Sequence, residues 1–140
     1  MKFEDLEIYK LAEKLADQVW DLVAPWNGFA RDTIGKQLVR STDSIGANIA
    51  EGAGRGSYQD NRRFIRIARG SLNETRHWLR RAFRRKLLKE EHVQALKPLI
   101  DELAPRLNAY LRSIGTTNDK RPMTNDKGQM TKDKTKWTKS

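Results

Sequence analysis

The stretch SYQDNRRFIRIARGSLNETRHWLRRAFRRKLL, residues 57–88, decides the fold of this chain. Small and apolar residues recur along it at intervals of three and four, which is the spacing of one face of an α-helix. The predicted buried face comprises Phe64, Ile67, Ala68, Ser71, Leu72, Thr75, Leu79, Ala82 and Phe83. Ser57 and Asp60 resemble a capping box, with Asp in place of the usual Glu. We therefore predict one long amphipathic helix from Ser57 to about Leu88.

Two segments that precede this helix show the same periodicity. Residues 8–23 carry an apolar stripe with charged residues facing away from it, and Pro25 and Gly28 follow as stop signals. The next segment begins near Asp32, which is a good N-cap residue, and continues to the glycine-rich run at 52–56. Each segment predicts one amphipathic helix.

A fourth helical segment follows the long helix. Residues 93–114 repeat apolar side chains three and four apart, with Pro98 and Pro105 inside the segment. Each proline lacks a backbone N–H, so we expect a bend or a late helix start near Pro98. No segment alternates polar and apolar residues with a period of two. Four amphipathic helices joined by short loops predict an all-α fold, an antiparallel up-down four-helix bundle.

Length and sequence repeats divide the chain into two parts. A chain of 140 residues has room for one domain, which we place at residues 1–115. Residues 116–140 form an internal heptapeptide repeat, because Thr117, Thr124, Thr131 and Thr138 each begin a similar block. Each block holds one apolar residue at most, whereas a coiled coil needs two per heptad. We predict a disordered, basic heptapeptide-repeat tail.

Composition narrows the function classes. The chain has no cysteine, which excludes disulfides, a thiolate nucleophile and a cysteine-ligated metal, and which fits a cytoplasmic location. The first nine residues are charged and lack the apolar centre of a signal peptide. The apolar runs are too short to span a bilayer. We therefore expect a cytoplasmic protein that does not associate with membranes.

The positive charge is concentrated in one element. The whole chain carries +10 at pH 7; residues 55–89 alone hold twelve basic and two acidic residues, whereas residues 1–54 come to −3. Several cations on one face are what phosphate binding requires. The predicted nucleic-acid-binding residues are Arg62, Arg66, Arg69, Arg76, Arg80, Arg81, Arg84, Arg85 and Lys86. A solvated or salt-bridged helix face is the alternative, although like charges four apart destabilise a helix by about 0.2–0.5 kcal/mol per pair.

The segment before the long helix is rich in small residues. Small side chains at positions 41–53 would let neighbouring backbones approach closely, and Asn48 and Glu51 are placed to bond loop amides or the next helix start. A glycine-rich run before a helix can also cradle phosphate. Because no strand precedes the run and no Lys-Ser/Thr pair follows it, we favour the structural interpretation.

Aromatic and titratable residues give no catalytic pattern. Trp20, Trp26 and Trp78 fit core packing better than base stacking. His77 and His92 lack a partner at metal-ligand spacing and are interpreted as surface residues. The sequence contains no nucleophile elbow, no His-Glu-x-x-His and no paired carboxylates in an apolar setting. We expect a protein that binds rather than catalyses, with no metal and no cofactor.

Two motifs together resemble a known family. SIGANIAEG at residues 44–52, with Arg63-Phe64 and ARGSLNE at residues 68–74, resembles the 23S rRNA intervening-sequence proteins. FEDL at residues 3–6 resembles the family's start, although Tyr9 stands where Trp is common. The resemblance covers about residues 3–114. Its structural motif residues here are Ser44, Asn48, Glu51, Gly52, Gly70, Ser71 and Glu74.

The resemblance implies an up-down bundle that often assembles into a ring-shaped homopentamer. A related branch of the family is the accessory variability determinant of diversity-generating retroelements, a basic pentamer that binds a reverse transcriptase and RNA. The run from Arg76 to Lys86 replaces a stretch that is often more acidic or neutral in the family, and this difference favours the RNA-binding branch. We therefore predict a non-enzymatic, oligomeric RNA-binding protein with a reverse transcriptase as a candidate partner.

Other function classes stay open from the sequence. An rRNA intervening-sequence-encoded structural or interaction module, whose basic helix docks an acidic protein partner, is the first alternative. A nucleic-acid-processing enzyme is disfavoured because the sequence lacks a cluster of metal-binding carboxylates. Binding to a membrane surface is the least favoured class, since the basic stripe lies opposite core residues rather than exposed Trp or Leu.

Overall fold

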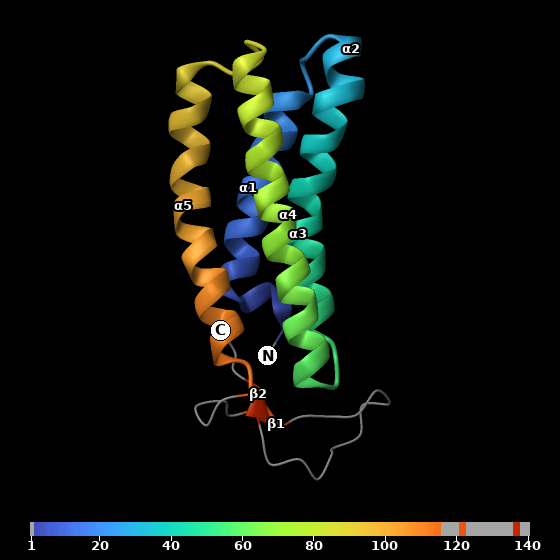
Figure 1. The fold of residues 1–140 in the computed structure, drawn as a ribbon, viewed down its shortest axis with the longest axis vertical. Coiled ribbons are helices and arrows are strands. Elements are labelled where there is room, and N and C mark those ends of the chain that lie inside the picture. The colour runs from blue at the N-terminus through green and yellow to red at the C-terminus, as the bar shows by residue number, and fades with distance from the viewer. Residues whose placement is uncertain (1, 116–120, 123–135, 138–140) are drawn as a thin grey trace.

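The computed structural model describes residues 2–115, 121–122 and 136–137. Its main body is an all-α, antiparallel up-down four-helix bundle, as the periodicity predicted (Figure 1). The four long helices are α1 (Glu7–Val23), α3 (Lys36–Ala53), α4 (Tyr58–Arg84) and α5 (Glu90–Ser113).

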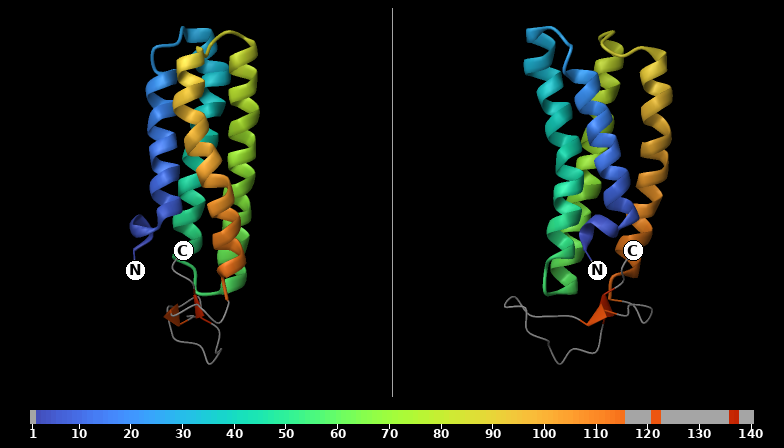
Figure 2. Two further views of the ribbon diagram at one scale, coloured as in Figure 1. Left: turned by 90° about the vertical axis from the view of Figure 1, so that its left-hand side faces the viewer. Right: turned by 180° about the vertical axis from the view of Figure 1, so that it is seen from behind.

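The four helices form a square in which each helix packs on its two neighbours. Helix α3 contacts α1 and α4, and α5 contacts the same two helices, so α1 and α4 lie on one diagonal. Both ends of the bundle sequence lie at one end of the long axis, and the α4–α5 turn lies at the other (Figure 2). With 27 residues, α4 is the longest helix, at about 40 Å. One outer face of α4 is therefore available along the whole bundle.

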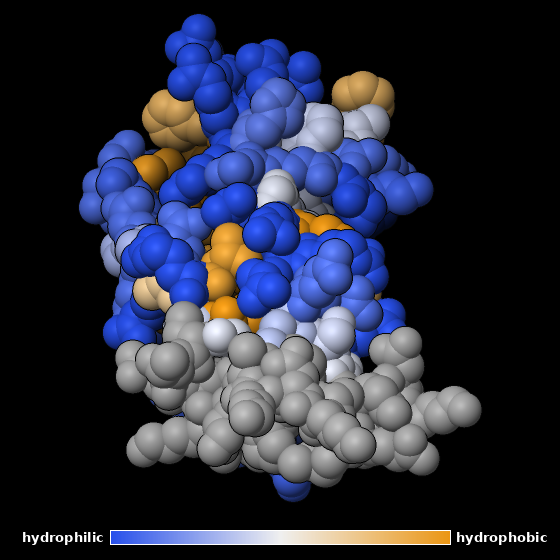
Figure 3. Space-filling view, turned by 60° about the horizontal axis from the view of Figure 1, so that its bottom comes forward, coloured by the Kyte–Doolittle hydropathy of each residue, from blue (hydrophilic) through white to orange (hydrophobic). Residues whose placement is uncertain are grey.

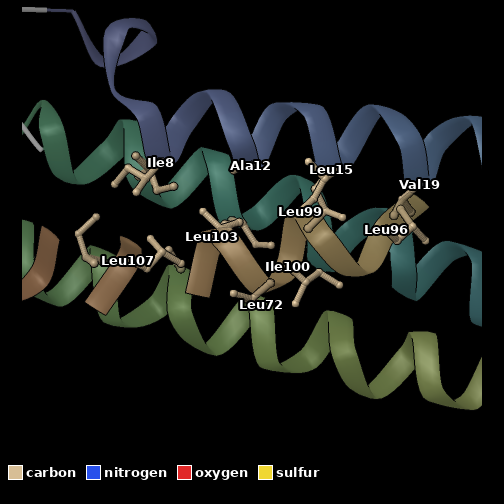
Figure 4. Close-up of a cluster of buried hydrophobic side chains, with 14 of the residues drawn as sticks. Ile8, Ala12, Leu15, Val19, Leu72, Leu96, Leu99, Ile100, Leu103 and Leu107 are labelled. Carbon is tan, nitrogen blue, oxygen red and sulfur yellow. The ribbon is translucent and has the colours of Figure 1, made fainter. Parts of the chain in front are cut away.

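Apolar side chains from all four helices fill the bundle interior. Figure 4 shows the layer between α1 and α5, where Leu15 and Val19 of α1 meet Leu96 and Leu99 of α5. Leu72 also contributes to this layer, from α4, which lies diagonally opposite α1 and next to α5 (Figure 4). The buried stripe predicted for α1 is thus confirmed, since hydrophobic burial is the main force that holds such amphipathic helices together.

The second helical segment begins earlier than the sequence indicated. A short helix α2 (Gly28–Ala30) and a π-helical turn η2 (Arg31–Gly35) run directly into α3, and a 3₁₀ turn η1 (Phe3–Asp5) precedes α1. The N-cap is Asn27, whose Oδ1 accepts a hydrogen bond of 3.0 Å from the backbone N–H of Ala30. The predicted start at Asp32 was wrong, because Asn27, five residues upstream, already caps the first helix turn.

Helix α4 starts where predicted, and five of its nine predicted buried residues are buried: Ala68, Ser71, Leu72, Thr75 and Ala82. Ser57 Oγ accepts a 3.0 Å hydrogen bond from the backbone N–H of Asp60, which is half of the expected capping box. The buried positions alternate by three and four, the heptad spacing of a left-handed coiled coil. They are Tyr58, Asn61, Ile65, Ala68, Leu72, Thr75 and Ala82, with Ser71 beside them.

Two apolar residues that the sequence assigned to this buried face lie outside it. Ile67 is 41% exposed and Phe83 is 46% exposed. The buried positions of α4 also include the polar Asn61, which a choice of residues by hydrophobicity leaves out. Trp20 is also 61% exposed, so its predicted core packing was wrong, whereas Trp26 and Trp78 pack against the core.

Helix α5 is continuous through both of its prolines. It begins at Glu90, so the predicted late start near Pro98 was wrong. Pro98 and Pro105 are both exposed, so neither proline ring is packed in the core. The start is capped by His92, whose Nδ1 accepts a 2.9 Å hydrogen bond from the backbone N–H of Lys89.

Small and polar side chains line the interface along which α3 and α4 pack, which forms a close seam between the two helices. Thr75 Oγ1 donates to Ser41 Oγ at 2.9 Å, and both residues are buried. Ser44 Oγ and Ser71 Oγ lie 2.9 Å apart one turn further on. Because each hydroxyl finds a partner across the seam, the two helices approach closely without leaving these groups unsatisfied.

Asn61 and Gly52 form the tightest contact of this seam. Asn61 is fully buried, and a Cβ added at Gly52 would lie 2.6 Å from its Oδ1. The same Cβ would lie 3.2 Å from the Asn61 backbone oxygen and 3.1 Å from Phe64 Cβ. The absence of a side chain at Gly52 therefore allows the C-terminal end of α3 to pack closely on α4.

The C-terminal tail contributes one short strand pair to the described residues. Strand β1 (Arg121–Pro122) pairs antiparallel with β2 (Lys136–Trp137), with Arg121 opposite Trp137. The rest of the tail, on which the predicted disorder falls, lies outside the described residues.

We predict that Gly52→Ala destabilises the fold by about 1–3 kcal/mol, because the added methyl group overpacks the seam. Gly70→Ala is the matched control: a Cβ there meets nothing within 4 Å, and alanine favours the helix by about 0.5–1 kcal/mol. Urea unfolding followed by circular dichroism measures both changes. Equal effects at the two positions would contradict the close approach at Gly52.

Candidate nucleic-acid interface

The nine predicted basic residues lie on α4 and on the turn that follows it. Seven of them are exposed: Arg66, Arg69, Arg76, Arg80, Arg84, Arg85 and Lys86. Arg76, Arg80 and Arg84 follow one another at intervals of four, so neighbouring Cβ atoms lie about 5–6 Å apart on one face. The structure therefore brings the C-terminal half of the stripe together on the outside of the bundle as an exposed cluster of Arg76, Arg80, Arg84, Arg85 and Lys86.

The N-terminal part of the stripe is tied to α5. Arg62 is half-buried and donates from Nη1 to the backbone oxygen of Ile114 at 3.0 Å. Arg69 Nη1 donates to Asn108 Oδ1 at 3.2 Å. These contacts hold α4 against the end of α5, so Arg62 and Arg69 combine a structural contact with their position in the stripe.

The two acidic residues of this basic stretch are paired away from the exposed cluster. Asp60 Oδ1 lies 3.7 Å from Arg63 Nε. Glu74 pairs with Arg40 of α3 and accepts a 3.1 Å hydrogen bond from Trp78 Nε1. Each carboxylate therefore pairs with an arginine that is not among the nine predicted nucleic-acid-binding residues.

The exposed cluster keeps its full positive charge within residues 2–115. None of the nine predicted residues forms an ion pair with a carboxylate in this part of the chain. Arg76 Nη1 is held by the neutral Asn73 Oδ1 at 3.0 Å. Uncompensated arginines on one face create the strong local potential that attracts phosphate groups.

The basic cluster ends at a Schellman turn built on a lysine. Leu87 N–H donates to Ala82 O at 2.9 Å, and Lys86 N–H donates to Phe83 O at 3.0 Å. Lys86 has a φ of +64°, a left-handed conformation in which glycine is usual. A cation at this helix end also interacts favourably with the helix dipole. The structure thus places one more positively charged residue, Lys86, in a backbone conformation that is strained for a residue with a side chain.

A groove runs beside the cluster between α4 and α5. It has a volume of about 320 Å³, and Phe83 and Leu88 contribute to its apolar lining. Arg76 and Arg80 line the α4 side of the groove. Cationic and apolar surface therefore lie next to each other at this end of the bundle. The coloured surface in Figure 3 is mostly hydrophilic, with separate apolar patches between the polar side chains.

The motif residues of α3 and α4 have separate roles in the structure. Asn48 Nδ2 donates to Ser44 O at 2.8 Å and to Ser44 Oγ at 3.0 Å, so it stays within α3 rather than reaching a loop amide. Glu51 pairs with Arg55 at 3.3 Å. Gly70 is exposed, unlike the closely packed Gly52. Ser44, Gly52, Ser71 and Glu74 make contacts between α3 and α4, whereas Asn48, Glu51 and Gly70 do not.

A family model for 23S rRNA-intervening sequence proteins matches residues 4–109. This chain belongs to that family. A solved structure with the same fold is a protein of unknown function from the S23 ribosomal protein family of Bacteroides thetaiotaomicron, with 24% identity and a TM-score of 0.67. The match covers 75% of this chain and 98% of that one. No protein with a curated description matches this chain.

A second groove of this intervening-sequence protein is acidic and lies between α1 and α3. It has a volume of about 360 Å³ and is lined by Tyr9, Glu13, Asp17 and Asp43, among others. Partial burial, and then the carboxylate of Asp17, raise the pKa of Asp43 above its usual range. Burial and Glu13 likewise raise the pKa of Tyr9. The bundle therefore carries an acidic groove on α1 and α3 and a basic face on α4.

The described part of the chain shows neither a metal-binding cluster nor a membrane-spanning helix. No group of three or more His, Cys, Asp or Glu side chains in it is arranged to hold a metal ion. Its helices include none that is both long enough and apolar enough to cross a membrane.

We expect Lys86→Gly to stabilise the protein by about 0.5–1 kcal/mol, because glycine adopts the left-handed conformation without strain. Arg85→Gly is the control, since Arg85 has an ordinary φ of −92° and glycine there only adds unfolded-state entropy. Thermal unfolding measures both. A Lys86→Gly protein less stable than the Arg85→Gly protein would contradict the strain at this turn.

Asp43→Asn is expected to raise stability at pH 7. The folded protein binds the Asp43 proton more tightly than the unfolded chain does, so ionisation costs folded-state stability as pH rises from about 3.9 through the raised pKa. Melting temperatures at pH 7 and pH 3 measure the difference, which should disappear at pH 3. Asp32→Asn, outside the groove, is the control; a gain that persists at pH 3 would contradict the explanation.

Proposed function

We propose that this protein is a non-enzymatic RNA-binding bundle whose basic α4 face holds the phosphate backbone. The observation that carries the proposal is the exposed cluster Arg76, Arg80, Arg84, Arg85 and Lys86, which has no acidic partner within residues 2–115. A solvated surface helix normally mixes charges of both signs. A face that keeps only one sign, at a cost to helix stability, fits a polyanionic ligand better than it fits a purely structural role.

Arginine suits this ligand for a chemical reason. Its planar guanidinium donates paired hydrogen bonds to phosphate oxygens and stays charged at any physiological pH. Arg76, Arg80 and Arg84 lie on successive turns, about 6 Å apart along the helix axis, so they can contact several phosphates along one strand. Such contacts position a nucleic acid but do not read its sequence.

The biological setting that we propose is an accessory role for a diversity-generating-retroelement-type reverse transcriptase and its RNA. The basic run from Arg76 to Lys86 and the resemblance to that branch support this setting. We also propose a cytoplasmic homo-oligomer, with a pentamer favoured by the resemblance. The acidic α1–α3 groove and the basic α4 face support self-association, since opposite charges on two faces suit contacts between copies.

A structural or interaction module is the second candidate function. In that case α4 would dock an acidic protein partner, and the apolar groove beside Arg76 and Arg80 is the observation in its favour. The two functions differ in their ligand: RNA affinity would then be weak, whereas a tight complex would form with an acidic protein.

We predict that the combined variant Arg80→Gln, Arg81→Gln, Arg84→Gln and Arg85→Gln abolishes RNA binding and keeps the helical circular dichroism spectrum. The measurement is fluorescence anisotropy of the full chain with a structured RNA across a salt series. For the unaltered protein we expect submicromolar affinity and a log–log salt slope of about −4 or steeper, because several phosphates are neutralised together.

The control removes four exposed cations from the other helices: Lys10→Gln, Lys14→Gln, Arg106→Gln and Arg112→Gln. It changes the net charge by the same amount, so it should retain most of the affinity if the α4 cluster is the binding face. Unchanged affinity of the α4 variant at low salt would exclude the proposal. Equal losses in both variants would indicate attraction by net charge alone.

A further inference from the structure

An aromatic ring lies exposed within the basic cluster. Phe83 is 46% exposed and lies on the last turn of α4. It follows Arg80 by three residues and Arg76 by seven, so the three side chains share one face of the helix. The helix places Arg76 about 10 Å from Phe83 along its axis. Arg76 and Arg80 therefore lie along the same face of α4 as the large apolar ring of Phe83.

The ring forms one wall of the groove between α4 and α5. Leu79, Leu88, Val93 and Leu96 provide further apolar lining, and the groove has a volume of about 320 Å³. On the α5 side, Lys97 Nζ pairs with Asp101 Oδ2 at 2.6 Å, so these two charges satisfy each other. The groove thus has an apolar interior, and Arg76 and Arg80 on its α4 side form no ion pair within residues 2–115.

The surroundings of Phe83 differ from those of Phe64, at the other end of the same helix. The guanidinium carbons of Arg63 and Arg55 lie 4.4 Å and 5.0 Å from the centre of the Phe64 ring. Over the Phe83 ring, by contrast, no guanidinium or second ring is positioned within residues 2–115. The exposed part of the Phe83 ring is therefore available to a flat ligand.

We propose that this groove takes an unpaired nucleobase of single-stranded RNA, stacked on Phe83, while Arg76 and Arg80 hold the adjacent phosphates. The inference rests on the proposed RNA-binding function and adds the class of RNA. A base has an apolar face, a polar edge and a phosphate on either side, which matches the ring, the groove and the arginines. A base inside a duplex is already stacked and cannot enter such a groove, so the site selects loops and single strands.

The test compares two RNAs with the same number of phosphates: an unstructured single strand and a fully paired duplex. Phe83→Leu keeps the apolar volume but removes the aromatic ring. Relative to the unaltered full-length protein, we expect it to weaken single-strand binding about 5- to 100-fold and to leave duplex binding unchanged. Phe83→Trp should retain the preference for the single strand. Ile67→Leu, another exposed apolar residue of α4 that does not line the groove, should change neither affinity.

Each other outcome overturns this inference in a distinguishable way. If Phe83→Leu leaves single-strand binding unchanged while the four-arginine variant abolishes it, base stacking is excluded and the proposed function stands. If Phe83→Leu weakens both RNAs equally, the ring acts on the helix rather than on a base. If the unaltered protein binds neither RNA at low salt, this inference and the proposed function fail together.

Discussion

The rotation of α4 about its own axis is the constraint on which the rest of this bundle depends. The seam with α3 sets that rotation through two hydroxyl pairs, Ser41 with Thr75 and Ser44 with Ser71. The contact of Gly52 with Asn61 adds a steric limit. Turning α4 by one residue would break both pairs and move apolar side chains from the core toward solvent. With its inner face fixed in this way, the basic stripe can only face outward.

The packing of α4 against α3 also determines which charged residues of α4 remain unpaired. Glu74 lies on α4 but pairs with Arg40 of α3, so the seam removes this carboxylate from the arginines of its own helix. The outer face of α4 is left with like charges at intervals of four residues. Each such pair lowers the stability of an isolated helix by about 0.2–0.5 kcal/mol. A 27-residue helix buried along one side against two neighbours tolerates this cost, because tertiary packing supplies most helix stability in proteins.

The sequence predicted the elements better than their details. The four helices, the Ser57 cap and the outward basic stripe follow from residue spacing, because amphipathic periodicity and capping are local properties. Asn61 in the core and Phe83 at the surface could not be predicted, since hydrophobicity assigns each to the opposite place. The cap at Asn27 was missed because a π-helical turn joins it to α3, and no sequence signal of that turn was recognised.

The sequence by itself determined the helical class of this protein, the number of its long helices and the sign and location of its excess charge. These properties depend on neighbours within a few turns of one chain segment. Only the tertiary structure decided which arginines are free and which, like Arg62, bind another helix. It also decided that Phe83 lines a groove next to Arg80. Both depend on how α4 and α5 pack, and that packing joins residues distant in sequence.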